Sequence, residues 1–166
     1  MKFDPTESYH QRDLSIPENE AMYKFKQLVV NLITIGSGAD IQKNIMGPIS
    51  AVADEMGVDF DVYFTQSYPL YLQFNLIDRH QLDKLMELDQ FFAARSGNAM
   101  PGFWNDALLA WHPDWKKARV MANNILNALH LDEIRLICTR KETFENTGYG
   151  RRLVSVSTQM SLVWHK

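Results

Sequence analysis

The sequence is poor in cysteine and has no long apolar run. Cys138 is the only cysteine among 166 residues, so no disulfide can form within the chain, and cysteine-rich zinc frameworks are excluded. No stretch of about 18 apolar residues is present that could span a bilayer as a helix. The charged, proline-containing first residues do not have the pattern of a secretory signal. We therefore expect a protein of the reducing cytoplasm without membrane contact.

Motifs for catalysis and cofactor binding are also missing. The segment Gly36–Lys43 comes closest to a phosphate cradle, but it matches neither GxxxxGK[ST] nor GxGxxG, and a glycine-rich turn between helices is the preferred interpretation. The His-x-Asp pairs at 112–114 and 130–132 flank a predicted helix, which places them about 27 Å apart, too far to share a metal ion. Asp59 and Asp61 would lie about 6.6 Å apart on one face of a strand, where we expect solvation rather than cation binding. We predict no enzyme active site, no metal site and no cofactor.

What remains is the composition of an ordinary globular domain. Hydrophobic residues make up 46% of the chain and charged residues 22%, which fits one core. The net charge of −3 disfavours a free-standing nucleic-acid binder. Residues 1–99 carry 8 Lys and Arg against 14 Asp and Glu, and residues 100–166 carry 9 against 6. We expect an extended arm over residues 1–16 and a single domain over residues 17–166.

Apolar residues recur at spacings of three and four in several segments, a pattern that predicts amphipathic helices. The predicted helices cover residues 17–36, 41–57 with a bend or restart at Pro48, 79–95, and 113–131, with a short helix in the aromatic segment before the last of these. In the first helix, the β-branched run Leu28–Ile35 leaves a buried strand as an alternative.

Elsewhere the period changes to two. Apolar and polar residues alternate over 58–65 and again over 70–76, which predicts an antiparallel hairpin. A second hairpin is predicted from strands Glu133–Lys141 and Arg152–Trp164, joined by a polar loop. One face of the last strand is formed by Val154, Val156, Thr158, Met160, Leu162 and Trp164.

The predicted fold class is therefore α+β, with a mostly antiparallel sheet of two hairpins and helices packed on one face. Its last strand has 13 residues and a length of about 43 Å. Because strands usually have about five or six residues, the far end of this strand needs a partner or a cover.

Two groups of residues stand out as a candidate interface. The segment 101–115 contains three of the four tryptophans, and aromatic side chains at this density form either core or interface anchors. Basic residues gather at both ends of the last loop, where they could contact phosphates or acidic protein, or simply keep the loop solvated. The candidate interface residues are Phe103, Trp104, Arg140, Lys141, Arg151 and Arg152.

The order of these patterns resembles a known family. Pro69–Ile77 leads into Gln81–Met86, and the chain ends in the charged loop and long strand of Gly148–Trp164. This order is similar to that of tail terminator and tail completion proteins of long-tailed bacteriophages. The resemblance implies a subunit without enzymatic activity, in a ring that is commonly hexameric and caps the tail tube. No functional residue carries over from the family, and the basic loop residues Arg151 and Arg152 are our candidates for inter-subunit or DNA-facing contacts.

We therefore expect a non-enzymatic structural or assembly protein that acts through protein–protein contacts as a homo-oligomer or in a larger assembly. Its place would be the host cytoplasm or the virion. The alternative is a small cytoplasmic inhibitor or regulator that binds one host protein through the acidic front or the aromatic loop. An enzyme that binds a phosphorylated small molecule at Gly36–Lys43 is the third interpretation.

Overall fold

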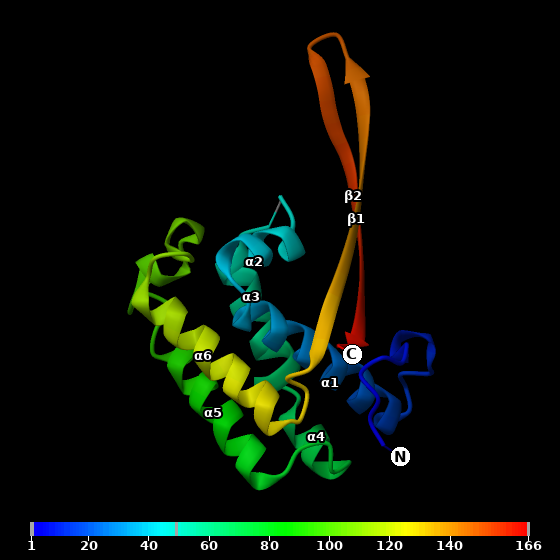
Figure 1. Ribbon diagram of the computed structural model, residues 1–166, viewed down its shortest axis with the longest axis vertical. Helices are drawn as coiled ribbons and strands as arrows, with labels where there is room; N and C mark the ends of the chain where they lie inside the picture. The colour runs from blue at the N-terminus through cyan, green and yellow to red at the C-terminus, as the bar shows by residue number, and fades with distance from the viewer. Residues whose placement is uncertain (1, 49, 166) are drawn as a thin grey trace.

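The computed structural model describes residues 2–48 and 50–165 and shows a helical body from which one long β-hairpin projects (Figure 1). The elements, in chain order, are η1 (Tyr9–Gln11), α1 (Pro17–Gly36), α2 (Ala39–Met46), α3 (Val52–Phe60), the π-helical turn η2 (Asp61–Thr65), α4 (Tyr68–Gln73), α5 (Arg79–Ala93), η3 (Pro101–Trp104), η4 (Asp106–Leu108), α6 (Pro113–Ala128), β1 (Ile134–Thr147) and β2 (Gly150–Trp164). No helix in this described part is long and apolar enough to cross a membrane.

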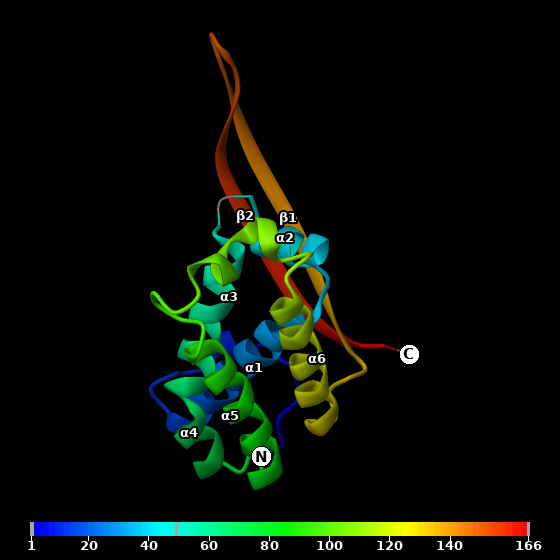
Figure 2. The same ribbon diagram turned by 90° about the vertical axis from the view of Figure 1, so that its left-hand side faces the viewer.

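Helix α1 is the centre of the body, as Figure 2 shows, with α3 on one side and α6 on the other. Pro17 occupies its first turn together with Glu18 and Glu20, which favours a helix start because acidic groups complement the helix dipole. The predicted helix over residues 17–36 is confirmed. The β-branched run within it does not form a strand.

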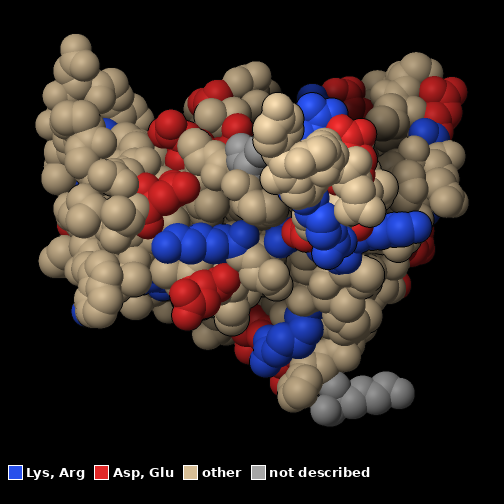
Figure 3. Space-filling view, turned by 90° about the horizontal axis from the view of Figure 1, so that it is seen from above, with Lys and Arg blue, Asp and Glu red and all other residues tan. Residues whose placement is uncertain are grey.

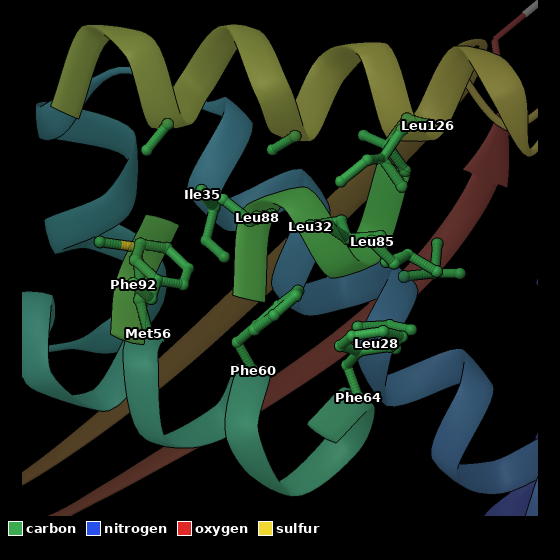
Figure 4. Close-up of a cluster of buried hydrophobic side chains, with 14 of the residues drawn as sticks. Leu28, Leu32, Ile35, Met56, Phe60, Phe64, Leu85, Leu88, Phe92 and Leu126 are labelled. Atoms are coloured by element: carbon green, nitrogen blue, oxygen red, sulfur yellow. The ribbon is translucent and has the colours of Figure 1, made fainter. Parts of the chain in front are cut away.

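The core lies between helices. Side chains from α1, α3, α5 and α6 converge in one apolar cluster (Figure 4). The ring of Phe60 lies 5.2 Å from that of Phe64 and meets the ring of Phe92 edge-on at 5.5 Å. Each such fully buried side chain contributes about 1.5–3 kcal/mol of transfer free energy. The helices therefore form most of the core, to which the base of the hairpin adds Ile134 and Leu162.

The predicted hairpin over residues 58–76 is wrong, because this segment is helical. Met56, Phe60 and Phe64 are buried at a spacing of four, whereas Val58 and Val62, which we had assigned to the same buried face, are exposed. The amide of Gln66 donates to the carbonyl of Asp61 five residues back. This hydrogen bond closes the π-helical turn η2, which continues directly from the end of α3. The β-branched residues favoured a strand, but packing against α1 and α5 overrides that preference.

The second half of the predicted hairpin forms α4 for a related reason. Pro69 lies in the first turn of α4, where its missing N–H costs no helical hydrogen bond. Tyr71, which the alternation assigned to the polar face, is 0% exposed, and its hydroxyl donates to the carbonyl of Tyr63. Asp59 and Asp61 accordingly do not lie on a strand; they end α3 and begin η2.

The C-terminal hairpin is confirmed, and it is longer than predicted. Strand β1 continues through Thr147 and β2 starts at Gly150, so the predicted loop over residues 142–150 shrinks to a turn of Gly148 and Tyr149. Gly150 has φ +121°, a conformation that favours glycine. The fold is α+β with one two-stranded antiparallel hairpin among the described residues, in place of the two hairpins that the sequence predicted.

The residues that precede α1 lie along its surface. Tyr9 is buried, and its hydroxyl oxygen accepts a hydrogen bond from the amide of Asp4 at 2.9 Å. Phe3 stacks on Tyr9 and meets Phe25 of α1 edge-on. Lys26 of α1 donates to a carbonyl of this segment. Aromatic contacts therefore attach residues 3–9 to the helical body.

Candidate protein-interaction surface

The hairpin is fixed to the body only over its first half. Ile134 and Leu162, near its base, are buried in the core. Further along, the guanidinium of Arg140 donates to the carbonyl of Asn44 at the end of α2. All residues from 141 to 152 are exposed. We call residues 141–157, which lie beyond Arg140, the distal hairpin; Figure 1 shows it extending past the helices.

A β-bulge determines which side chains share a face of the distal hairpin. Thr143 pairs with Ser155, but Phe144 pairs with Leu153, so Val154 is an extra residue. Alternation from the paired residues places Val156, Leu153 and Phe144 on the face that continues from buried Leu162. The sequence assigned Val154 to this face; the bulge puts Leu153 there instead. Apolar side chains therefore continue beyond the last contact with the body.

The basic residues of the candidate interface lie along this hairpin, but they have different roles. Arg140 is occupied by its contact with α2. The guanidinium of Arg151 lies 4.3 Å from the ring centre of Phe144, a cation–π contact. Arg152 forms an ion pair with Glu145 across the strands. Lys141 is exposed. On the face seen from above, Lys and Arg side chains alternate with Asp and Glu side chains and do not form one continuous basic surface (Figure 3).

Phe103 and Trp104 are not near these basic residues. Phe103 is 1% exposed and stacks on Trp115 with ring centres 4.5 Å apart, so it has no surface to offer a partner. The indole N–H of Trp104 donates to the carbonyl of Arg95 at 2.7 Å, and the ring is half-buried. The exposed tryptophan of this segment is Trp111, at 76%, which the sequence did not single out.

A groove of about 730 Å³ lies where α3 and η2 face the end of α5 and the turn η3. Its rim carries the carboxylates of Asp54, Asp61 and Asp89, and its floor includes the rings of Phe92 and Trp104. The hydroxyl of Thr65 donates to Asp89 at 2.6 Å. An apolar floor with an acidic rim suits a basic or aromatic segment of a protein.

Sequence reasoning missed this groove because it placed residues 58–64 on a strand. On a helix, the seven-residue spacing of Asp54 and Asp61 corresponds to two turns and one face. Nearby Asp59 is half-buried, and burial together with the carboxylate of Glu55 raises its pKa above the ordinary value. The sequence indicated the groove only through the four-residue spacing of Met56, Phe60 and Phe64, and the alternation of apolar and polar residues over 58–65 predicted a strand instead.

The chemistry considered from the sequence has little geometric support. Within residues 2–48 and 50–165, no group of three or more His, Cys, Asp or Glu is placed to hold a metal ion. Lys43 lies in the last turn of α2, away from the amides that start this helix. His112 and His130 lie at opposite ends of α6, and the imidazole of His112 accepts from the amide of Asp114 at 3.1 Å. His112 therefore caps the start of α6, and His130 follows its end.

The exposed distal hairpin and the acidic groove are thus two candidate surfaces for contacts with other proteins. Comparisons with protein-family models, with curated proteins and with solved structures each found no match to this chain.

Proposed function

We propose that this protein is a non-enzymatic assembly protein that acts through protein–protein contacts, with the distal hairpin as its contact arm. One observation carries the proposal: a paired ribbon extends beyond Arg140 with residues 141–152 all exposed and with apolar side chains on it. A two-stranded hairpin in water is at most marginally stable by itself. An arm that binds a neighbouring protein gains the missing contacts.

The specific form that we propose is a ring subunit of a bacteriophage tail, because the long terminal hairpin is part of the resemblance to tail terminator proteins. Neighbouring subunits of a ring contact each other head to tail, and an arm that reaches out of a compact body is suited to such contacts. Arg151 and Arg152 lie beside the turn of this arm. They would face the next subunit or the DNA that passes through the ring.

A variant with a shortened hairpin tests this function. Lys141 and Ser157 pair across the strands, so joining them through an Asn-Gly turn removes residues 142–156 and keeps the Arg140 contact. Size-exclusion chromatography with light scattering should show that the full chain self-associates and that the shortened chain is a monomer. The thermal midpoint of the shortened chain should equal that of the dissociated full chain, because residues 141–152 are exposed and add little to the core. An unchanged assembly size after shortening would contradict the proposal.

The acidic groove favours a second candidate function, a regulator that binds one partner protein through a basic segment. Replacing Asp54 and Asp61 by Asn removes two rim carboxylates from exposed positions and should leave the fold intact. For a regulator, these changes would weaken partner binding and the shortened hairpin would not. For an assembly protein, the result is the reverse. Titration calorimetry with the copurified partner distinguishes the two.

A further inference from the structure

We propose that β2 is the strand that makes the self-contact: its free edge pairs with β2 of a second copy about a two-fold axis, so that the two hairpins form one four-stranded antiparallel sheet. This inference rests on the proposed function in its general form, an assembly protein that uses the hairpin as its contact arm, and it names the partner and the edge. A two-fold contact closes a dimer, so the inference replaces the head-to-tail contact of a ring by a symmetric one. The occupant is a second copy of this chain.

The two edges of the hairpin differ in charge. From Leu153 to Trp164, β2 contains no charged residue. Strand β1 carries Arg135, Arg140, Lys141, Glu142 and Glu145. Charged side chains, lysine above all, are a common device by which proteins protect a free sheet edge from pairing. Protection by charge is thus present along β1 and missing from Leu153 to Trp164 of β2.

The two edges also differ in access. Strand β1 packs on α1, and its Arg140 is held by α2. Large apolar side chains are exposed on both strands: Ile137 of β1 is 50% exposed, and Val154 and Met160 of β2 are 54% and 44% exposed. A long, neutral, exposed strand rich in β-branched residues aggregates unless it is covered. A cover for β2 is therefore expected in the functional state.

Neutrality also identifies the cover. In a two-fold antiparallel pair the residue on the axis faces its own copy, so a charged residue there meets a like charge; residues Leu153 to Trp164 of β2 contain no charge that could do so. The run 154–161, exposed except for half-buried Val156, contains Ser, Thr and Gln side chains, which form favourable cross-strand hydrogen bonds with their own kind. A charged partner strand would gain nothing from such an edge. The composition of β2 thus fits a copy of itself.

Lysine variants matched across the hairpin test this pairing. Ser157 lies opposite Lys141 and Gln159 opposite Thr139, all on one face of the hairpin. The variant S157K/Q159K places two lysines on β2, and T139K creates the same lysine pair on β1 next to natural Lys141. We expect S157K/Q159K to weaken self-association at least tenfold in sedimentation equilibrium. T139K should leave it within about twofold of the unchanged chain.

The outcomes separate the inference from the proposed function. If T139K dissociates the assembly and S157K/Q159K does not, the self-contact uses β1 and the inference is overturned. If neither variant dissociates it although the shortened hairpin does, the arm acts through its tip; the inference then fails and the proposed function survives. If the shortened chain, which keeps residues 157–164 of β2, stays associated, the distal hairpin is not the contact arm and the proposed function fails. If S157K/Q159K does not dissociate that shortened chain either, the inference fails as well.

Disulfide trapping provides a readout that is independent of stability. In a Cys138→Ser background, single cysteines are placed at each position from 154 to 161. Opposed residues in an antiparallel pair have Cα atoms about 4.5–5.5 Å apart, within the disulfide range. Only the position on the two-fold axis faces itself, so we expect one position to give a linked dimer readily. Equal linking at all positions, or at none in a chain that associates, would overturn the inference.

Discussion

At the scale of single residues, several polar side chains connect segments that are far apart in the sequence. The carboxylate of Asp106 accepts from the amides of Val52 and Ala53 at 3.0 and 2.8 Å, so it caps α3 from 54 and 53 residues away. The residue before α3 is Ala51, which has no side-chain acceptor for these amides. The start of α3 therefore depends on the turn η4.

Replacing Asp106 by Ala should destabilise the fold by about 1–2 kcal/mol, because two amides at the start of a helix lose their acceptor. Urea denaturation measures the loss. The control is Asp83→Ala, which removes an ion pair with Arg79 whose side chains are largely exposed, and which should cost less than about 0.5 kcal/mol. Equal effects of the two substitutions would show that the cap contributes no more than a surface charge.

Asp114 makes stability depend on pH. A hydrogen bond from Arg95 at 2.8 Å lowers the pKa of the Asp114 carboxyl below its ordinary value. A lowered pKa in the folded state stabilises the fold above the unfolded pKa of about 3.9, and this contribution is lost as the pH falls through the folded value. We expect D114N to cost about 1 kcal/mol or less at pH 7 and to flatten the loss of stability below pH of about 4.

Denaturation curves at several pH values check this. Asp4 and Asp13 also have lowered pKa values, because hydrogen bonds from the residue two positions further on stabilise their carboxylates. Part of the acid sensitivity should therefore remain in D114N. A pH dependence identical to that of the unchanged chain would rule out a contribution from the Arg95 pair.

At the scale of elements, close packing fixes α3 against the turn η3. A methyl group on Gly57 would lie 2.6 Å from Cζ3 of Trp104. In most helices, Gly to Ala stabilises by about 0.5–1 kcal/mol. Here we expect Gly57→Ala to destabilise, because the ring must move and give up its hydrogen bond to Arg95. Tryptophan fluorescence and urea denaturation report both effects.

A double-mutant cycle provides the control for this packing. In a Trp104→Ala background the obstacle is gone, so Gly57→Ala should become neutral or stabilising. The same sign in both backgrounds would contradict the close contact. Because Gly57 and Trp104 both line the acidic groove, the cycle also measures how closely its lining is packed.

The contact between Arg140 and α2 sets the length of the free arm. Arg140→Met keeps much of the side-chain volume and removes the hydrogen bond to the carbonyl of Asn44. We expect faster amide hydrogen exchange at neighbouring β1 and β2 positions, because local opening then costs less. Lys141→Met, at an exposed position next to it, is the matched control and should leave exchange unchanged. Equal exchange rates in the two variants would show that the hairpin is held by its buried base residues and not by Arg140.

At the scale of the whole molecule, the fold divides stability and assembly between two parts. The helical body contains most of the buried core, and the distal hairpin contains exposed residues. If the arm binds a second copy, the thermal midpoint must rise with protein concentration, because association stabilises the folded state. Over a hundredfold range of concentration we expect a rise of a few degrees. In calorimetry, the shortened chain should show no such rise.

Local sequence determined the helices and strands in segments where the spacing of apolar residues fits only one type of secondary structure. The helices Pro17–Gly36, Arg79–Ala93 and Pro113–Ala128 follow from apolar spacing together with a proline in the first turn or, for α5, a capping box of Asp78 and Gln81. The terminal hairpin follows from alternation over more than ten residues. In these segments the local preference and the packed state agree, so the sequence alone was sufficient.

Tertiary structure decided the rest. Over residues 58–76, strand and helix patterns were both present, and burial of Phe60 and Phe64 against other helices selected the helix. The polar segment 142–150 looked like a loop, yet antiparallel backbone pairing needs no apolar side chains and extended both strands to the turn. The acidic groove joins residues from α3 and α5. Such surfaces form only when segments far apart in the sequence pack together, and the spacing of residues within one segment does not predict that packing.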